Sequence, residues 1–172
     1  MKAEIIKTAR LNAARTHRLE LLRLWNADRN LCVFIGLNPS TADENEDDPT
    51  IRRCIRFADD WGYGGLLMLN LFSFRSTDPA GLRGHVPDEE QNLDTLYKYI
   101  ESKYTGIVVA AWGTHAKVWG RNLLSDIHAK FPEHRKKLHH LGTTKDGHPK
   151  HPLYLRADTK PVPFWYGEHH ES

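Results

Sequence analysis

The sequence of 172 residues has only two cysteines and no long apolar run. Cys32 and Cys54 are too few for the disulfide framework of a small secreted protein. Both fall in apolar segments, so we expect them to be buried free thiols. No stretch approaches the roughly 20 apolar residues that a membrane-spanning helix needs. The first residues also lack the pattern of a secretory signal, so we expect a cytoplasmic protein with no membrane partner.

Recognised catalytic and metal-binding motifs are scarce as well. No serine, cysteine or threonine lies in a nucleophile motif, which argues against covalent catalysis. Eight of the 11 histidines follow residue 127. No set of His, Cys and carboxylate residues has the spacing of a zinc site, so we expect no metal and no cofactor. A metal-dependent hydrolase that uses the histidine and acidic clusters remains an alternative.

The composition is that of a globular protein, with 40% hydrophobic and 27% charged residues. No repeat or low-complexity segment occurs, so the length predicts one domain over residues 1–172, with an N-terminal extension and hairpin strand at 1–30 and a tail at 157–172. The formal net charge is only +2, but residues 114–160 hold ten Lys/Arg against four Asp/Glu. This basic segment suits a phosphate-bearing partner, or it is a solvated helix face.

Strands and helices alternate along the predicted chain. A strand at 18–25, turn residues at 26–30 and an apolar run at 31–36 predict a β-hairpin that leads into a buried strand. Helix-start and helix-stop residues then bound the following elements. These are a helix begun by Asp48-Pro49 and ended by Gly62, a strand at 66–72, a helix begun by Asp88, a strand at 107–111, a helix at 114–130 and a strand at 138–141.

Most of these strands are apolar on both faces, which is typical of parallel sheets covered by helices. We therefore predict a three-layer α/β fold. Its central, mostly parallel four-stranded sheet has helices on both faces, and an N-terminal β-hairpin precedes it. Ligands of such sheets bind beyond the carboxyl ends of the strands. The residues that follow each strand are therefore the candidate site.

Two asparagines follow the first two buried strands. Asn38 lies in the loop Gly36-Leu-Asn-Pro39, where it can orient a water or polar ligand, or bond to its own backbone. Asn70 is a polar residue in an apolar strand, so it needs either a structural partner or a ligand such as a nucleobase edge. Phe72 and Phe74 follow it and can stack on a base or pack in the core.

The later strands end in other polar groups. Thr114 and His115 follow Gly113 at the start of a predicted helix, whose N-terminus either binds an anion or is a simple helix entry. His148 and His151 each precede a proline, which biases their backbone toward an extended state. Such a rigid imidazole can stabilise developing negative charge, or it is a solvated group of a stiff loop.

Taken in order, these segments resemble the motifs of the uracil-DNA glycosylase superfamily over residues 31–156. The similar segments are Gly-Leu-Asn-Pro at 36–39, Met-Leu-Asn-Leu-Phe at 68–72, Trp-Gly-Thr-His-Ala at 112–116 and His-Pro-Leu-Tyr-Leu at 151–155. A narrower resemblance spans nearly the whole chain. Asn-Pro-Ser-Thr-Ala-Asp, Asp-Pro-Thr-Ile-Arg-Arg-Cys and His-Pro-Leu-Tyr-Leu are similar to a bacterial and phage family, domain of unknown function 1643.

The superfamily resemblance implies a uracil-DNA glycosylase-like fold and a glycosidic hydrolase that acts on a modified or damaged base in nucleic acid. Asn38 would position the water, Asn70 would read the base, and His151 would stabilise the departing base, with His148 as its substitute. The other implied contacts are Gly36, Pro39, Phe72 and Phe74 to the base, and Ser40, Thr41, Arg52, Arg53, Thr114 and His115 to the phosphates or backbone. The alternative is a module of the same fold that binds a nucleotide or nucleic acid without catalysis.

Three features of the sequence depart from the superfamily pattern. Ser40-Thr41 take the place of the aromatic residue that often follows the proline of the first motif. Leu153 replaces the serine of the His-Pro-Ser motif, and no cysteine quartet is present for the iron–sulfur cluster of some members. The acidic run at residues 43–48 lies beside the expected pocket, where we expect it to repel a DNA backbone. Arg52 and Arg53 are equally suited to offset this acidic charge.

Overall fold

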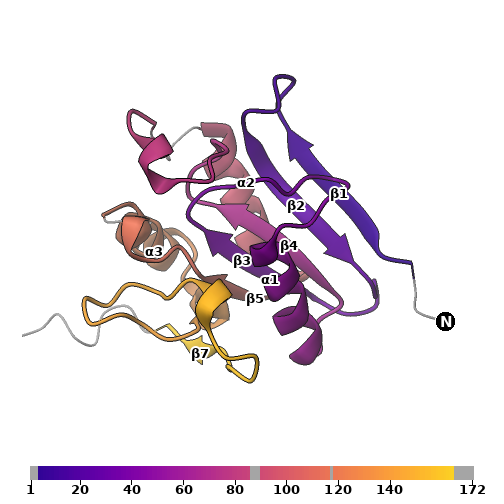
Figure 1. The fold of residues 1–172 in the computed structure, drawn as a ribbon. Coiled ribbons are helices and arrows are strands. Elements are labelled where there is room, and N and C mark those ends of the chain that lie inside the picture. Colours follow the sequence, from indigo (N-terminus) through magenta and orange to yellow (C-terminus); the bar gives the residue numbers. More distant parts are fainter. Residues whose placement is uncertain (1–3, 86–89, 117, 165–172) are drawn as a thin grey trace, which may run out of the picture.

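The structure is a computed structural model that describes residues 4–85, 90–116 and 118–164. Its centre is a mixed sheet of seven strands in the order β1-β2-β4-β3-β5-β6-β7 (Figure 1). The strands are β1 (Ile6–Leu11), β2 (Arg18–Leu24), β3 (Leu31–Gly36), β4 (Gly65–Asn70), β5 (Thr105–Ala110), β6 (Leu138–His140) and β7 (Val162–Pro163). The three pairs among β4, β3, β5 and β6 are parallel, and the other three pairs are antiparallel.

The predicted four-stranded, mostly parallel sheet is therefore wrong in strand number and in parallel character. The strand β1 was missed because Ile-Lys-Thr-Ala-Arg-Leu mixes polar and apolar residues on an exposed edge. The strand β7 was missed because it has only two residues, Val162 and Pro163, and follows Pro161, and prolines rarely continue a sheet. Both missed strands add antiparallel pairs at the two edges of the sheet.

The predicted hairpin between residues 18–25 and 31–36 is also wrong. The strand β2 pairs with β1 on one side and with β4 on the other, so β4 lies between β2 and β3. The backbone N–H groups of Trp25 and Asn26 donate to the carbonyl of Gly64 just before β4. The chain after β2 is therefore attached to the start of β4 and does not turn back onto β2.

Helices cover both faces of the sheet, which gives three layers (Figure 1). The helix α1 (Pro49–Asp60) packs on one face through Ile51, Cys54, Phe57 and Ala58. The helices α2 (Glu90–Glu101) and α3 (Val118–Lys130) pack on the other face. Side chains of β3, β4 and β5 alternate between the two cores, as buried parallel strands require. The α/β class and the helices on both faces are thus present.

The start and end of α1 confirm the sequence prediction. The Asp48 side chain accepts a hydrogen bond from the Ile51 N–H at 2.9 Å, Pro49 is the first residue of the helix, and Gly62 follows it with φ +84°. The predicted cap of α2, Asp88, lies outside the described residues. In place of one helix over residues 114–130, the structure has a 3₁₀ turn at Thr114–Ala116 and α3 from Val118. The turn follows Gly113, whose φ is +70°.

Cys32 and Cys54 are buried free thiols, as expected. Both lie in the core between α1 and the sheet, where burial raises the pKa of each thiol well above its ordinary value. Among the described helices, none combines the length and the apolar character that crossing a membrane requires.

Candidate functional site

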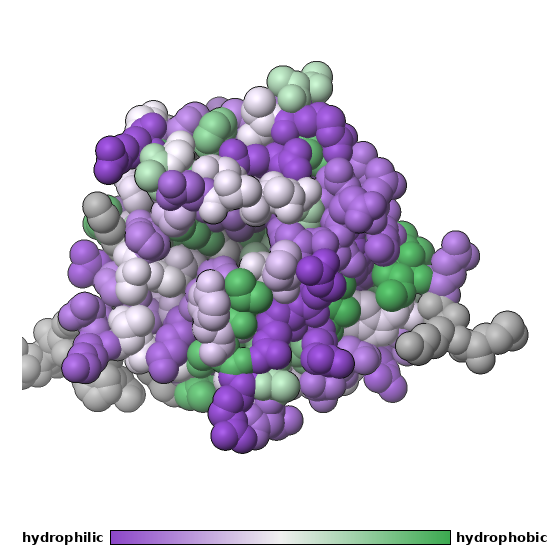
Figure 2. Space-filling view, viewed as in Figure 1, coloured by the Kyte–Doolittle hydropathy of each residue, from purple (hydrophilic) through white to green (hydrophobic). Residues whose placement is uncertain are grey.

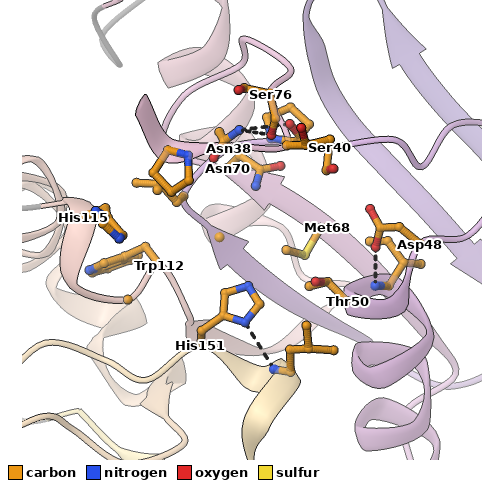
Figure 3. Close-up of a pocket in the computed structure, with 18 of the residues that line it drawn as sticks. Asn38, Ser40, Asp48, Thr50, Met68, Asn70, Ser76, Trp112, His115 and His151 are labelled. Atoms are coloured by element: carbon orange, nitrogen blue, oxygen red, sulfur yellow. Dashed lines mark hydrogen bonds between the residues drawn. The ribbon is translucent and has the colours of Figure 1, made fainter. Parts of the chain in front are cut away.

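A pocket of about 480 Å³ lies at the carboxyl ends of β3, β4 and β5 (Figure 3). The start of α1 and the 3₁₀ helix Pro152–Tyr154 complete its walls. This volume is in the range of small-molecule sites. On the face shown in Figure 2, hydrophobic residues are scattered among hydrophilic ones and form no continuous apolar surface.

Asn38 enters this pocket with its amide held in one orientation. Its Nδ2 donates to the carbonyl oxygens of Pro39 at 3.0 Å and Ser76 at 2.8 Å. Because carbonyl oxygens only accept, the amide nitrogen must face them, and Oδ1 is the atom that remains as an acceptor. Asn38 can therefore accept a hydrogen bond from a water or ligand, which agrees with a positioning role.

Asn70 is held through its amide oxygen, whereas Asn38 is held through its amide nitrogen. Its Oδ1 accepts from Nη2 of Arg18 at 3.3 Å, and within the described part of the chain its Nδ2 has no hydrogen-bond partner. The side chain is 3% exposed and lines the pocket. Gly36 lies opposite Asn70 on β3, and a Cβ there would come within 2.9 Å of Nδ2 and 2.8 Å of Met68 Cε. A glycine at residue 36 thus leaves room for a donor amide on the pocket floor.

His151 points into the pocket from the 3₁₀ helix that follows it (Figure 3). Its Nδ1 accepts from the N–H of Leu153 at 3.2 Å, so the neutral ring carries its proton on Nε2. Burial lowers the pKa of His151, although the charge of Asp48 opposes this shift. The imidazole is consequently neutral at pH 7 and is a hydrogen-bond donor to a ligand.

Asp48 is a pocket residue that the sequence analysis missed. It was predicted only as a helix cap, and its Oδ1 does cap α1. The same side chain lines the pocket and is only 9% exposed, which places a carboxylate near His151. The one available signal was its place at the end of the loop that begins with Gly36 and Asn38. Arg18 was missed too, because an arginine in an apparent hairpin strand suggests a solvated position.

The other predicted site residues divide into two groups. Gly36, Pro39, Ser40, Thr114 and His115 line the pocket, and Trp112 is an additional buried aromatic there. The remaining six residues do not line it: Phe72, Phe74, His148, Thr41, Arg52 and Arg53.

The predicted site residues outside the pocket lie in several different places. Phe72 is buried in the core on the side of α2 and α3, and Phe74 stacks on His85 at a ring distance of 3.7 Å. His148 lies in a turn, where its N–H donates to Thr144. Arg52 and Arg53 line a second groove along α1, which shares only Leu153 with the pocket.

The acidic run is fixed by arginines of the β1–β2 hairpin. Nε of Arg23, a side chain with no exposed surface, donates to Asp47 at 2.7 Å. Arg15 pairs with Asp43 and Glu44. Arg52 contacts only the backbone carbonyl of Asp47. The acidic charge is thus largely neutralised by the hairpin and not by α1, so repulsion of a DNA backbone would be weaker than we expected.

A family model gives the relationship of this chain to known proteins. The model described as "Protein of unknown function (DUF1643)" matches residues 18–153. The chain belongs to this family. The match begins at β2 and ends in the 3₁₀ helix after His151, so the DUF1643 region contains Asn38, Asp48, Asn70 and His151.

Two further comparisons add no relative of this DUF1643 protein. Neither the curated proteins nor the solved structures contain a match. The match to the family model confirms the narrower resemblance, to DUF1643. The likeness to uracil-DNA glycosylases stays a prediction. Across the described residues, no group of three or more His, Cys, Asp or Glu side chains is close enough to hold a metal ion.

Proposed function

We propose that this pocket takes a nucleobase of a nucleic acid and that the protein hydrolyses the N-glycosidic bond of a modified or damaged base. The observation that carries the proposal is the convergence of Asn38, Asn70 and His151 on one cavity of about 480 Å³. These residues are far apart in sequence, and each has one polar atom fixed internally and the other available to a ligand. The motif order that resembles uracil-DNA glycosylases supports the same reaction.

The proposed reaction begins with a base that leaves its strand and enters the pocket, at an unstacking cost of a few kcal/mol. Asn70 donates to an acceptor on the base edge, and Asn38 Oδ1 accepts from a water near the sugar C1′. The water oxygen forms a bond to C1′ while the C1′–N bond breaks, and the electron pair goes to the base. His151 donates from Nε2 to the departing base, which takes its proton from solvent after release.

In this proposal Asp48 accepts the proton of the attacking water. The amide of Asn38 cannot act as a strong base, whereas a carboxylate in the same pocket can. Asp48 Oδ1 is occupied by the helix cap, so Oδ2 is the atom left for the water. Arg52 and Arg53, together with Arg56, line the groove that meets the pocket at Leu153, and there they would contact phosphates of the flanking strand.

The test is a strand-cleavage assay with alkali treatment. Single- and double-stranded oligonucleotides would carry uracil, hypoxanthine, xanthine or a hypermodified pyrimidine. We expect alkali-dependent cleavage at one of these bases. The variant Asp48→Asn should lower kcat about 100-fold or more, since general base catalysis contributes that much. Lys98→Gln removes an exposed charge on α2, outside the basic segment 114–160, and should leave the rate unchanged. If no base gives a cleavage product in either single- or double-stranded oligonucleotides, the proposal that the protein is a glycosidic hydrolase is rejected.

The non-catalytic alternative is favoured by one observation, the amide at Asn38 where glycosylases of the resembled superfamily also use an acidic residue. A binding module would hold the same bases or oligonucleotides without releasing the base. Equilibrium binding measured alongside cleavage separates the two functions. Binding of these bases or oligonucleotides without any cleavage would establish the binding module.

A further inference from the structure

Arg18 is a buried cation on the floor of the pocket. Its side chain is only 2% exposed, yet it is one of the residues that line the cavity. Its Nη1 donates to the carbonyl of Ala42 at 2.9 Å and its Nη2 to Asn70 Oδ1 at 3.3 Å. Its Nε has no partner within the described part of the chain. A guanidinium has five N–H donors, so most of its capacity is unused.

The charge of Arg18 is not neutralised by a direct ion pair. Among the described residues, no carboxylate oxygen lies within 4.0 Å of its guanidinium, and both of its acceptors are neutral. Buried charges are normally paired, because an unpaired one is costly in a medium of low polarity. Burial accordingly lowers the pKa of Arg18 to about 10, which still leaves it cationic at neutral pH.

The charges around Arg18 leave a net positive floor. Asp43 and Asp48 attract it, and Arg23 and Arg75 repel it. Asp43 is paired with Arg15, and Arg23 with Asp47. Arg75 donates only to backbone carbonyls. Of the groups that act on Arg18, the guanidinium of Arg75 and the carboxylate of Asp48 therefore have no direct ion pair among the described residues, and together with Arg18 they leave one positive charge in excess.

The neighbouring polar groups present donors to the same space. Arg18 holds Asn70 Oδ1, so the Asn70 amide offers only N–H groups to a ligand. His151 offers Nε2–H, because its Nδ1 is occupied by the N–H of Leu153. Two donors and a cation around a cavity next to the apolar Trp112 and Met68 are suited to a flat ligand that carries negative charge.

We propose that the pocket floor is a subsite for an ionised nucleobase ring, with Arg18 as the residue that supplies the charge. The inference rests on the proposed function, since it concerns the same pocket and names the form of base that the pocket prefers. An acidic base, ionised before its glycosidic bond breaks or as it breaks, would place its negative charge against Arg18, Asn70 and His151. Neutral bases would bind more weakly.

The experiment compares two free bases by titration calorimetry at about pH 8. The probes are 5-nitrouracil, which is an anion there, and uracil, which is neutral. We expect 5-nitrouracil to bind at least about tenfold more tightly, equivalent to one oriented charge interaction of about 1.4 kcal/mol. The variant Arg18→Gln should lose this preference and keep the affinity for uracil. Lys98→Gln should keep both affinities.

A second measurement covers the case in which Arg18→Gln does not fold. In the wild-type protein, the affinity for 5-nitrouracil should fall as the pH is lowered and its ring becomes neutral. Uracil titrated over the same range corrects for the protein groups around the site. Asp48, His115, His151 and Tyr154 line the pocket, and Asp43, Arg23 and Arg75 act on Arg18 from outside it. A parallel change for both ligands would overturn the inference.

The outcomes separate this inference from the proposed function. Equal affinity for the two bases overturns the anion subsite but leaves base binding and hydrolysis in place. Binding of neither base overturns the subsite, and the cleavage assay alone then decides the proposed function. Preference for 5-nitrouracil in a protein that cleaves no oligonucleotide supports the subsite and leaves only the binding module.

Discussion

At the scale of single residues, the pocket side chains share one arrangement. Each has one polar atom bound to the protein, and this bond decides which atom faces the ligand. The bound atoms are Nδ2 of Asn38, Oδ1 of Asp48, Oδ1 of Asn70 and Nδ1 of His151. The sequence predicted three of these four residues as site candidates. It could not give the available atom of Asn38 and Asn70, because their partners Ser76 and Arg18 are distant in sequence and are set by the fold.

The protonation of His151 leads to a prediction about pH. Burial lowers the folded-state pKa of His151 below its ordinary value of 6.5, so the unfolded chain binds the proton first. The free energy of unfolding should therefore be highest above about pH 6.5 and fall as the pH drops through and below that value. Protonation also puts a hydrogen on Nδ1 and removes the bond from Leu153.

The variant His151→Asn isolates this contribution. Asparagine is a good cap and can accept from the Leu153 N–H, but it does not titrate. Urea unfolding at about pH 7.5 and about pH 5 should show a smaller loss of stability in the variant than in the wild type. Burial also lowers the pKa of His128 and His140, and these contribute equally to both proteins. The same loss in both proteins would contradict the prediction.

At the scale of elements, local sequence signals predicted the positions of helices and strands well, but they did not predict which strands pair. The cap and proline at the start of α1 act within one helical turn, so the sequence predicted this helix correctly. The apolar runs of β3, β4 and β5 were also predicted within a residue or two. Which strand lies beside which depends on contacts distant in sequence. The register of β2 on β4, for example, joins Leu21 to Met68, and no local pattern contains that pairing.

The start of α1 allows the structural and chemical roles of Asp48 to be separated. Asparagine caps helices about as well as aspartate, whereas alanine does not. Asp48→Ala should lower the free energy of unfolding by about 1 kcal/mol, and Asp48→Asn should change it little. Both variants should lose base release if the carboxylate accepts a proton, because neither retains a base. Full activity in a stable Asp48→Asn protein would remove Asp48 from the mechanism.

At the scale of the whole molecule, the β1–β2 hairpin supports one wall of the pocket indirectly, because it holds the acidic segment that precedes Asp48. Arg23 does not line the pocket, but it holds the acidic segment through Asp47 and through the carbonyls of Asp43 and Glu46. That segment leads directly into Asp48. The sequence could not reveal this support, because β2 was predicted to pair with residues 31–36. Arg52 and Arg53 of α1 were equally suited to offset the acidic run or to contact phosphates.

Substitution of Arg23 should therefore change the pocket, although Arg23 does not line it. Arg23→Gln leaves Asp47 without its buried partner, which should cost about 3 kcal/mol of unfolding free energy. Amide hydrogen exchange should become faster at Asn45 and Glu46, whose N–H groups donate to Asp43 within the segment.

Base binding should weaken in the same Arg23→Gln protein, because the loosened segment follows Ala42, whose carbonyl holds Arg18 at the pocket. The matched control is Arg10→Gln on β1, which removes contacts to Glu20 and Thr95 away from the acidic segment. It should leave exchange at Asn45 and base affinity unchanged. If Arg23→Gln keeps slow exchange and full affinity, the wall is held by α1 and the Asp48 cap alone, and the hairpin has no part in shaping the site.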